Sequence, residues 1–473
     1  MQSDGSRRVT VQRLPNPSSE EDAVEHPGSL RRRMFAVAVT AVFAVAGCST
    51  TAPSSASAPP SGGASPAPST QPSAPPSTTA AKLSFLTFET PALDAAFWDN
   101  SIKVALQQVP GLSIDKIVTP GADRNGYAKQ LQASGQFPDI LASINPRDFL
   151  EAGLLQPFDQ AWLDSNFVLP NANAIKAKTY IPPTNSQIIP LVFYNKDIFA
   201  ANNIAVPTNY AEFVDAATKL KAAKVTPIEF AGAEPWSASM VLVGLASADV
   251  LGKDPQWIQK RYANTVKFSD PLFANAMKKA QDLIDMGAFG SAALSVDFAT
   301  ANKNFLDGKS GMYPMGSWFT GSGYMTADQA THFGAFPFPT DDGSLVVPFN
   351  VGGTTAVSTK AADVAAGVKF AQAWSLAPEN LKVLIESDGA YPMMKNLTLD
   401  QFGAKTSTLY QDTYKLVTSD NTKVSSFGWV NNDDSLAPGI NDAFYALAQG
   451  LFSNKDLAAQ LAQLDADWDA AAK

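Results

Sequence analysis

Three tryptophans stand at positions that suit contact with a ligand. Trp318 directly follows Gly316 and Ser317 at the end of a short apolar stretch, and Trp236 follows the strand-like run VTPIEFAG. Trp429 lies in the segment FGWVNNDD. Small residues let another molecule approach the backbone, and the indole face offers a flat surface for stacking. Packing in the interior is the alternative for each of the three, because most tryptophans are largely buried.

Four further residues are candidates for polar contact with a ligand. Glu89 and Asn145 each come directly after a predicted strand, and Gly353 offers its backbone N–H group beside a second glycine. A third possibility for Trp429, beside stacking and packing, is a lid over the ligand with Asn431 as its polar partner. The alternatives are surface solvation for Glu89 and capping of a turn for Asn145. We expect Asp139 to cap a strand entry and Arg147 to pair locally with Asp148.

Composition excludes several kinds of site. The 473-residue chain has one cysteine, two histidines and a net charge of −9, and no basic stripe lies beyond residue 33. These counts argue against a disulfide, a cysteine or HExxH metal centre and a nucleic-acid surface. Only three arginines follow residue 81: Arg124, Arg147 and Arg261. Because arginine is the usual clamp for carboxylates and phosphates, this scarcity favours a neutral ligand. We expect no catalytic residue, metal or cofactor.

The N-terminal segment predicts export and lipid anchoring. SLRRRMFAVAVTAVFAVAGC combines arginines, an apolar run from Met34 to Val45 and small residues before Cys48. This order is typical of a signal peptide, and the run is too short for an ordinary membrane span. Its end resembles a bacterial lipobox, which would make residues 1–47 a signal peptide and Cys48 the lipidated residue. The arginines leave the Sec and twin-arginine routes both open. Residues 48–81, rich in Ser, Pro and Ala, predict a linker.

The remaining chain alternates short strands with helices. Strands are expected over 82–89, 113–118, 137–143, 188–194 and in VTPIEFAG and FNVGGTTAVSTK, with helices between and after them. Thr208 is expected to open a helix whose Glu212 completes the cap. Trp98, Trp162, Trp257, Trp374 and Trp468 fall in helical stretches and are expected in the interior. The alternation predicts an α/β fold of mostly parallel sheets covered by helices, with ligands beyond the strand ends.

Several segments together resemble the bacterial extracellular solute-binding proteins of ABC importers, in particular the sugar-binding, maltose-binding-protein-like branch. They are PDILASINPRDFLEAGLLQPFD, IPLVFYNKDIFAANNIAVPTNYAEFVDAATKLK, FLDGKSGMYPMGSWF, GAFPFP, VGGTTAVST and DADWDAAAK. The resemblance covers essentially all of residues 82–473. Asn209 departs from the pattern, since a tryptophan often stands there.

The resemblance implies a type II fold of two lobes joined by hinge crossings. Lobe 1 would comprise 82–195 and 346–388, and lobe 2 would comprise 196–345 and 389–473. Tyr194 and Tyr391 would lie beside the crossings, and both are candidates for contact with the ligand. It implies a lipid-anchored monomer on the extracytoplasmic face of the cell membrane. That monomer would close over a sugar at Trp318, Trp236 and Trp429 and present it to membrane-spanning permease subunits.

Three other functions remain open at this point. A surface-anchored carbohydrate-active enzyme would also use aromatic residues, although no pair of acids stands out in the sequence. A binding protein for a non-sugar solute, such as a polyamine or an oligopeptide, is compatible with the acidic charge. A structural lipoprotein would bind nothing. The sequence does not name the sugar, its linkage or the permease.

Overall fold

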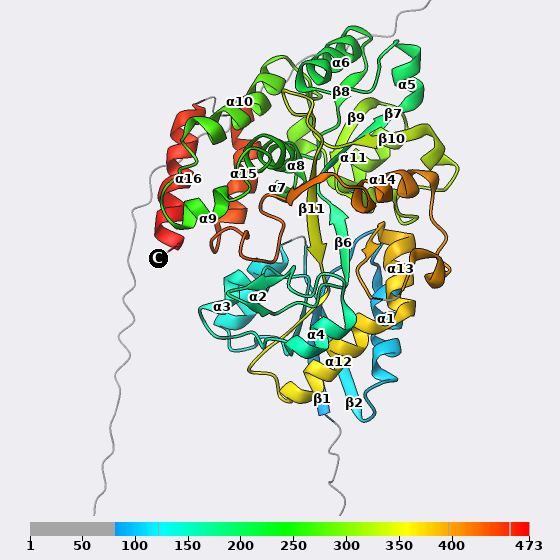
Figure 1. The fold of residues 1–473 in the computed structure, drawn as a ribbon, viewed down its shortest axis with the longest axis vertical. Coiled ribbons are helices and arrows are strands. Elements are labelled where there is room, and N and C mark those ends of the chain that lie inside the picture. The colour runs from blue at the N-terminus through cyan, green and yellow to red at the C-terminus, as the bar shows by residue number, and fades with distance from the viewer. Residues whose placement is uncertain (1–80, 122, 396, 454–455, 473) are drawn as a thin grey trace, which may run out of the picture. The chain divides into compact units, whose positions relative to one another are not determined.

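The computed structural model describes residues 81–121, 123–395, 397–453 and 456–472, all in one compact unit of the chain. Three four-stranded sheets and their covering helices make up this unit (Figure 1). The predicted signal peptide, Cys48 and the linker up to residue 80 lie outside the described residues. Within the described part, no helix has the length and apolar character needed to cross a membrane.

The first sheet holds the N-terminal strands in the order β12-β3-β1-β2. Its strands are β1 (Ala81–Thr87), β2 (Leu112–Val118), β3 (Ile140–Ala142) and β12 (Thr355–Val357). β1 pairs in parallel with β2 and β3, whereas β12 is antiparallel to β3. The mostly parallel pairing of this sheet agrees with the prediction made from alternating strands and helices. In the other two four-stranded sheets most pairings are antiparallel, which the prediction did not anticipate.

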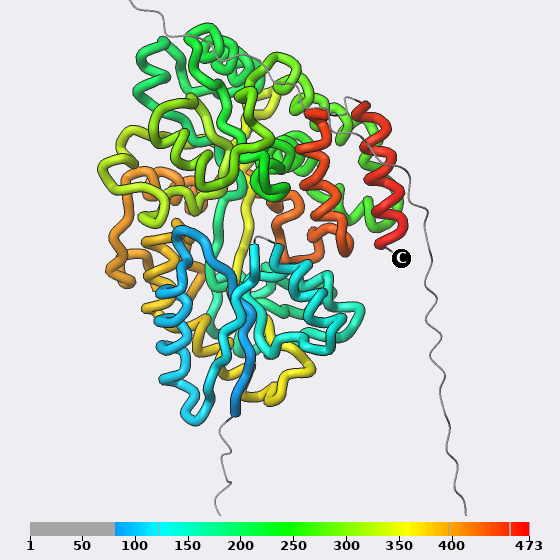
Figure 2. Tube along the Cα trace, turned by 180° about the vertical axis from the view of Figure 1, so that it is seen from behind, coloured from blue at the N-terminus to red at the C-terminus, as the bar shows by residue number. Residues whose placement is uncertain are grey.

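Helices from two distant parts of the chain cover this sheet. α1 (Ala95–Leu106) packs against α12 (Val364–Leu376) and α13 (Pro378–Asp388). Figure 2 shows the same arrangement in the trace, where the blue N-terminal segment runs beside the yellow segment near residues 360–390. α2 (Arg124–Ala133) follows β2.

The second and third sheets use the middle and end of the chain. The second has the order β10-β7-β9-β8, and the third has the order β13-β6-β11-β14. Their strands are β10 (Phe333–Phe336), β7 (Leu191–Asn195), β9 (Ser310–Met315), β8 (Thr226–Ile228), β13 (Tyr391–Pro392), β6 (Asn185–Ile188), β11 (Val346–Gly352) and β14 (Thr422–Ser425). A two-stranded hairpin, β4 (Ala174–Ile175) and β5 (Lys178–Thr179), stands apart from them.

β6 and β11 run between the first and second sheets (Figure 1). β6 leads directly into β7 of the second sheet, and β11 leads directly into β12 of the first. The expected single strand over 188–194 is therefore wrong: the run divides at Ile189 and Pro190 between two sheets. The glycine pair Gly352–Gly353 divides FNVGGTTAVSTK in the same way. The predicted residue boundaries of the two lobes stay a prediction.

The remaining helices surround these sheets. They are α3 (Arg147–Leu150), α4 (Gln160–Asn166), α5 (Lys196–Ala201), α6 (Tyr210–Ala222), α7 (Pro235–Ala238), α8 (Met240–Leu245), α9 (Trp257–Tyr262), α10 (Pro271–Asp285), α11 (Phe298–Leu306), α14 (Thr408–Thr418), α15 (Ile440–Ser453) and α16 (Leu457–Ala471). η1 (Ala246–Leu251), a π-helix, continues α8, and short 3₁₀ turns occur at η2 (Ala293–Ser295), η3 (Ser317–Thr320), η4 (Gln329–His332) and η5 (Leu399–Phe402).

Local hydrogen bonds settle two of the capping predictions. Asp139 behaves as expected, because its carboxylate accepts from the backbone and hydroxyl of Ser84, both at 2.7 Å. For α6, however, the cap is Asn209, whose side chain accepts from the Glu212 backbone N–H at 3.0 Å. Thr208 instead donates to the Glu212 carboxylate. The predicted helix is right and its cap is displaced by one residue.

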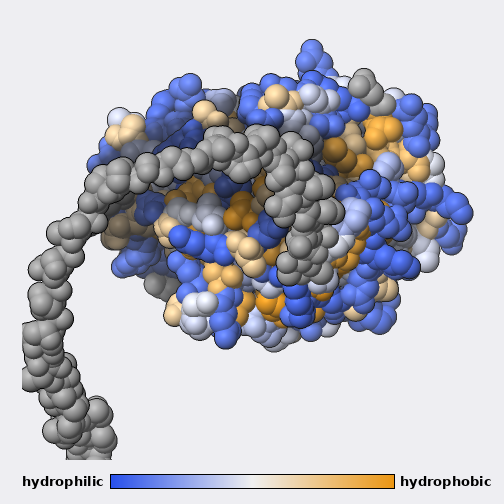
Figure 3. Space-filling model, turned by 90° about the horizontal axis from the view of Figure 1, so that it is seen from below, coloured by the Kyte–Doolittle hydropathy of each residue, from blue (hydrophilic) through white to orange (hydrophobic). Residues whose placement is uncertain are grey.

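Four of the five helical tryptophans lie in the interior, as predicted. Trp98 and Trp374 stack at a centroid distance of 5.7 Å behind the first sheet. Trp257 and Trp468 are also buried. Trp162 is only half-buried, because α4 lies at the surface. Hydrophilic residues make up much of the face seen in Figure 3, with apolar residues scattered between them.

Candidate functional site

Trp236, Trp318 and Trp429 lie together although three separate segments carry them. Trp236 is in α7, Trp318 in η3 and Trp429 in the loop after β14. Their ring centroids are 6.3 Å apart for Trp236–Trp318 and for Trp236–Trp429, and 5.7 Å apart for Trp318–Trp429. Trp236 and Trp429 are half-buried, and Trp318 keeps 8% of its surface exposed. The structure thus brings the three predicted tryptophans into one group.

Further aromatic rings extend this group at both ends. Trp236 packs edge-on against Phe298 at 5.0 Å, and Phe298 contacts Tyr324 at 5.9 Å. At the other end Trp429 contacts Tyr445 at 6.0 Å. We call the five half-buried rings the aromatic wall; they are Tyr445, Trp429, Trp236, Phe298 and Tyr324. Trp318 lies behind it. Partly exposed aromatic rings in mutual contact form a flat apolar surface suited to stacking.

Gly316 and Ser317 serve packing, which corrects their predicted contact with a ligand. A Cβ at Gly316 would overlap the indole of Trp318, so the tryptophan folds back over its own glycine and occupies the space. The Ser317 side chain is fully buried, and its hydroxyl accepts a hydrogen bond from the Ile188 backbone N–H at 3.2 Å. The two small residues therefore let Trp318 and β6 pack closely.

Asp388 lies close to Tyr324 at the end of the aromatic wall. It is the last residue of α13, and Gln187 of β6 donates to its carboxylate at 3.4 Å and to its carbonyl oxygen at 3.3 Å. Burial raises the pKa of Asp388 to about 7, although hydrogen bonds from Gln187 and Tyr324 and the charge of Arg124 oppose the shift. The side chain nevertheless keeps contact with solvent. A carboxyl group close to its titration point at neutral pH therefore stands beside the wall.

Arg124 faces Asp388 from the first residue of α2. Its guanidinium lies 4.0 Å from the centroid of the Phe88 ring, an arrangement that fixes its plane. Burial lowers the pKa of Arg124 to about 10, against the favourable charges of Tyr445, Asp388 and Asp123, so the group stays cationic at neutral pH. Its side chain donates no hydrogen bond to another described residue. Phe88 directly precedes the predicted residue Glu89, which is exposed.

Three other predicted residues take no part in the ring contacts of the aromatic wall: Asn145, Gly353 and Asn431. The Asn145 side chain accepts from the Arg147 backbone N–H at 3.1 Å, which confirms the alternative of a turn cap. Gly353 packs so closely on the Pro182 carbonyl that a Cβ would overlap it. Asn431 is half-buried two residues beyond Trp429.

The two tyrosines predicted beside the crossings do not join the aromatic wall. Tyr194 is half-buried on the second sheet, where its ring packs against Phe199 at 4.8 Å. Tyr391 is fully buried, donates to the Thr413 hydroxyl at 2.7 Å and packs against Tyr410. The predicted binding role of Tyr391 is thus wrong for this structure, because its side chain is sealed from solvent.

Arg147 links distant parts of the chain, in contrast to the expected local pair with Asp148. Its Nε donates to the Ser435 hydroxyl at 2.8 Å, and its Nη2 donates to the backbone oxygens of Asn432 and Asp433. The guanidinium also lies 4.8 Å from the Tyr262 ring. α3 is therefore attached to the loop 432–435, which follows Trp429 closely in the sequence.

A family comparison decides what kind of protein carries this site. Residues 102–382 match the family described as bacterial extracellular solute-binding protein. The chain belongs to this family. Its members are extracytoplasmic binding proteins, and the two-lobed α/β fold of the type II class agrees with the sheets described above.

Several proteins similar to this solute-binding protein carry names that refer to carbohydrates. It is 27% identical over 235 residues to a "multiple sugar-binding protein" of Streptococcus mutans, a match over 47% of this chain and 54% of that protein's length. The structure resembles that of a chitin oligosaccharide binding protein with a TM-score of 0.72 and 20% identity, covering 83% of this chain and 99% of that one. It resembles the binding protein RafE in complex with raffinose with a TM-score of 0.63 and 17% identity, covering 83% and 100%.

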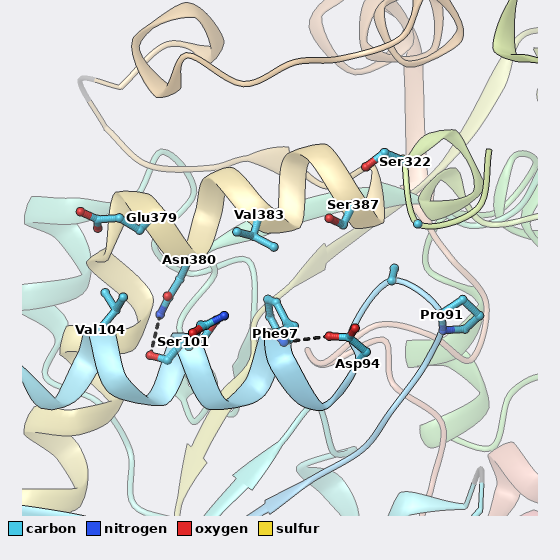
Figure 4. Close-up of a pocket in the computed structure, with 13 residues that line it drawn as sticks. Pro91, Asp94, Phe97, Ser101, Val104, Ser322, Glu379, Asn380, Val383 and Ser387 are labelled. Atoms are coloured by element: carbon cyan, nitrogen blue, oxygen red, sulfur yellow. Dashed lines mark hydrogen bonds between the residues drawn. The ribbon is translucent and has the colours of Figure 1, made fainter. Parts of the chain in front are cut away.

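The solute-binding protein also has a hollow whose lining includes Gly323 and Ser387, the sequence neighbours of Tyr324 and Asp388. A groove with a cavity volume of about 350 Å³ lies between α1 and α13 (Figure 4). Two of its polar groups already have partners, since Asp94 accepts from the Phe97 N–H and Asn380 donates to the Ser101 carbonyl. Phe97 is the one aromatic residue that lines it. This groove therefore offers a single ring, whereas the aromatic wall has five.

Sequence reasoning missed the charged and outer members of the site. Asp388 ends a helix before a glycine, which looks like an ordinary helix terminus, and Tyr324, Phe298 and Tyr445 have no distinguishing neighbours. The rarity of arginine was the one available signal, and it could have drawn notice to Arg124. Across the described residues, no cluster of His, Cys, Asp and Glu has an arrangement that could hold a metal ion.

Proposed function

We propose that this solute-binding protein captures a mono- or oligosaccharide between its two lobes and delivers it to the permease of an ABC importer. The contact of Trp236, Trp318 and Trp429 is the observation that carries the proposal. The C–H faces of a pyranose ring stack on aromatic rings, while its hydroxyls need fixed donors and acceptors. Arg124, Asp388 and Gln187 supply these beside the wall.

Capture rests on closure of the lobes around the sugar. The unliganded protein is open, and a ligand that contacts both lobes favours the closed form because it binds that form better. α2, which carries Arg124, shares a core cluster with strands of the first sheet. α7 and α15, which carry Trp236 and Tyr445, share a core cluster with strands of the second. A sugar on the wall therefore joins the two parts. No bond is made or broken, so the protein works as a receptor without catalysis.

The N-terminal segment defines where the receptor acts. Cys48 carries the lipid, and residues 49–81 hold the body off the extracytoplasmic face of the membrane as a monomer. The membrane-spanning permease subunits then recognise the closed form.

The test is a titration of tryptophan fluorescence in the purified protein with mono- and oligosaccharides, polyols and polyamines. A saturable change with one sugar is expected, and Trp236→Ala should weaken binding at least tenfold. Trp162→Ala is the matched control, because Trp162 is also half-buried but packs on Phe158 and Phe167 in the first part of the chain.

Other outcomes would contradict the proposal. A response to a polyamine and to no sugar would identify a non-sugar solute. Cleavage of a glycoside by the purified protein would identify a carbohydrate-active enzyme. A response to none of the compounds would leave the structural lipoprotein.

A further inference from the structure

The three arginines after residue 81 differ in how their donors are used. Arg261 donates to the Asp469 carboxylate at 2.6 Å and to the Asp465 backbone. Arg147 donates to Ser435 and to the loop that precedes it. Arg124 lies on the ring of Phe88 and has no hydrogen-bond acceptor among the described residues. A guanidinium has five N–H donors in a fixed plane, so Arg124 offers a full set to something else.

The position of Asp388 is unfavourable for a negative charge and therefore for the stability of the fold. It occupies the last turn of α13, and carbonyl groups give that end of a helix a partial negative charge. The surrounding protein further disfavours its charged form, as its raised pKa shows. Gln187 and Tyr324 nevertheless hold the carboxyl in place. Charged groups kept in unfavourable surroundings are often there for binding.

Arg124 and Asp388 lie close enough to interact, but they form no ion pair. They interact electrostatically, yet the ion pairs of the described residues, which extend to 4.0 Å, do not include this one. Both side chains keep contact with solvent. Tyr445, the end member of the aromatic wall, also interacts with Arg124, and Tyr324 at the other end contacts Asp388. The donor and the acceptor thus each interact with a ring of the wall.

We propose that Arg124 and Asp388 together bind hydroxyls at neighbouring ring positions of the sugar and thereby select its stereochemistry. Arg124 donates to one hydroxyl oxygen, and the Asp388 carboxylate accepts from the next hydroxyl. An epimer turns one of these hydroxyls away and leaves a desolvated charge unpaired, which costs more than a lost stacking contact. This inference rests on the proposed function and assigns selectivity within it.

The charges nearby favour a neutral sugar over an acidic one at this point. Asp123 contributes a favourable charge to Arg124 and an unfavourable one to Asp442. Burial raises the pKa of Asp442, and Asp123 and Asp148 raise it further. An anionic ligand would meet the same carboxylates, so one guanidinium would not compensate. A hydroxyl can both donate and accept a hydrogen bond, so sugar hydroxyls can satisfy the Arg124 guanidinium and the Asp388 carboxylate together.

The test compares the dissociation constants of two epimeric sugars for the native protein and for Asp388→Asn, Arg124→Lys and Trp236→Ala. Calorimetric titration supplies the constants, and thermal unfolding confirms that each variant is folded. Asp388→Asn and Arg124→Lys should each weaken the preferred epimer at least tenfold and bring the ratio between the epimers close to one. Trp236→Ala should weaken both epimers by the same factor and keep the ratio.

The experiment tests the selectivity role of Arg124 and Asp388 separately from the binding of a sugar. If the native protein binds a sugar and the Asp388 and Arg124 variants keep the native ratio, the selectivity role is overturned while the proposed function stands. If Trp236→Ala changes the ratio as much as they do, the pair has no special role. If the native protein binds no sugar of the panel, the proposed function falls, and the pair's role falls with it.

Discussion

Two regions of the molecule combine an arginine with tryptophan in opposite ways. Around Arg261, the guanidinium lies 5.2 Å from the ring of Trp468, and its Nη2 forms ion pairs with Asp465 at 3.4 Å and Asp469 at 2.6 Å. The aromatic part of this region is sealed, since Phe268 and Trp468 are both buried and pack at 5.6 Å. The ring faces and both Nη groups of Arg261 are engaged within the protein, while its Nε is buried without a partner among the described residues.

Around Arg124 the same residue types stay available. Its guanidinium lies on Phe88 without an acceptor, and Trp236 and Trp429 keep part of their surface open. Burial of apolar surface and pairing of charges give the Arg261 region its stability. The Arg124 region has less apolar burial and less charge pairing. A binding site needs this, because its groups must exchange water for ligand. The two regions contain the same residue types. They differ in whether the arginine is paired within the described part of the protein, as Arg261 is and Arg124 is not.

Removal of the buried tryptophan should give the largest loss of stability. Trp468→Ala leaves a large cavity under α16 and should lower the free energy of unfolding by about 3–5 kcal/mol. Trp236→Ala removes a half-buried ring and should cost about 1 kcal/mol while abolishing most ligand affinity. Urea unfolding followed by circular dichroism measures both. Equal losses for the two variants would show that Trp236 is simply part of the core.

Replacing Arg261 should destabilise the protein more than replacing Arg124. Arg261→Gln leaves the buried Asp465 without its cation, so the free energy of unfolding should fall by about 3 kcal/mol. Arg124→Gln breaks no hydrogen bond to a described residue and should change it by less than about 1 kcal/mol. Thermal unfolding of both variants at the same ionic strength is the measurement. A destabilisation by Arg124→Gln as large as that by Arg261→Gln would make Arg124 a structural residue.

Asp388 should make stability depend on pH. The folded state holds its proton up to a pKa of about 7, whereas the unfolded carboxyl titrates near 3.8, so this group lowers stability as pH rises between those values. Asp388→Asn removes that effect and should melt about 2–4 °C above the native protein at pH 8. The difference should shrink toward pH 5. A variant that melts lower at pH 8 would show that the Asp388 charge stabilises the fold.

Arg147 should give the smallest effect, because its Nε and Nη2 are bonded but its side chain is partly exposed. Arg147→Lys keeps the charge but loses the planar fork that reaches Ser435 and the backbone of 432–433. We expect a threefold to tenfold faster release of the sugar in stopped-flow measurements, with unfolding changed by about 1 kcal/mol at most. An unchanged release rate would mean that attachment of α3 to this loop has no part in holding the closed form.

The fold could be predicted from the sequence where local patterns decide it. The strands of the first sheet follow from short apolar runs between helices, and Trp98, Trp257, Trp374 and Trp468 follow from helical spacing. The division of 188–194 between two sheets was not predictable, because it depends on which distant strands pair with each half. A continuous apolar run carries no mark of that change.

The candidate site could be predicted only in its tryptophans. Trp236, Trp318 and Trp429 each follow a recognisable local setting, yet their contact with one another is a product of tertiary structure. Gly316 suggested room for a ligand, and the fold gives that room to Trp318 itself. Asp388 and Arg124 are 264 positions apart in the chain. Their facing positions depend on how α2 and α13 pack, which no short motif encodes.

The most direct test is a crystal structure of the protein with the sugar that the fluorescence panel selects. The account predicts a sugar ring stacked on Trp236 or Trp429, at carbon–carbon distances of about 4 Å, with hydroxyls on Arg124 and Asp388. A sugar bound elsewhere, such as the groove between α1 and α13, with the aromatic wall unchanged, would contradict it.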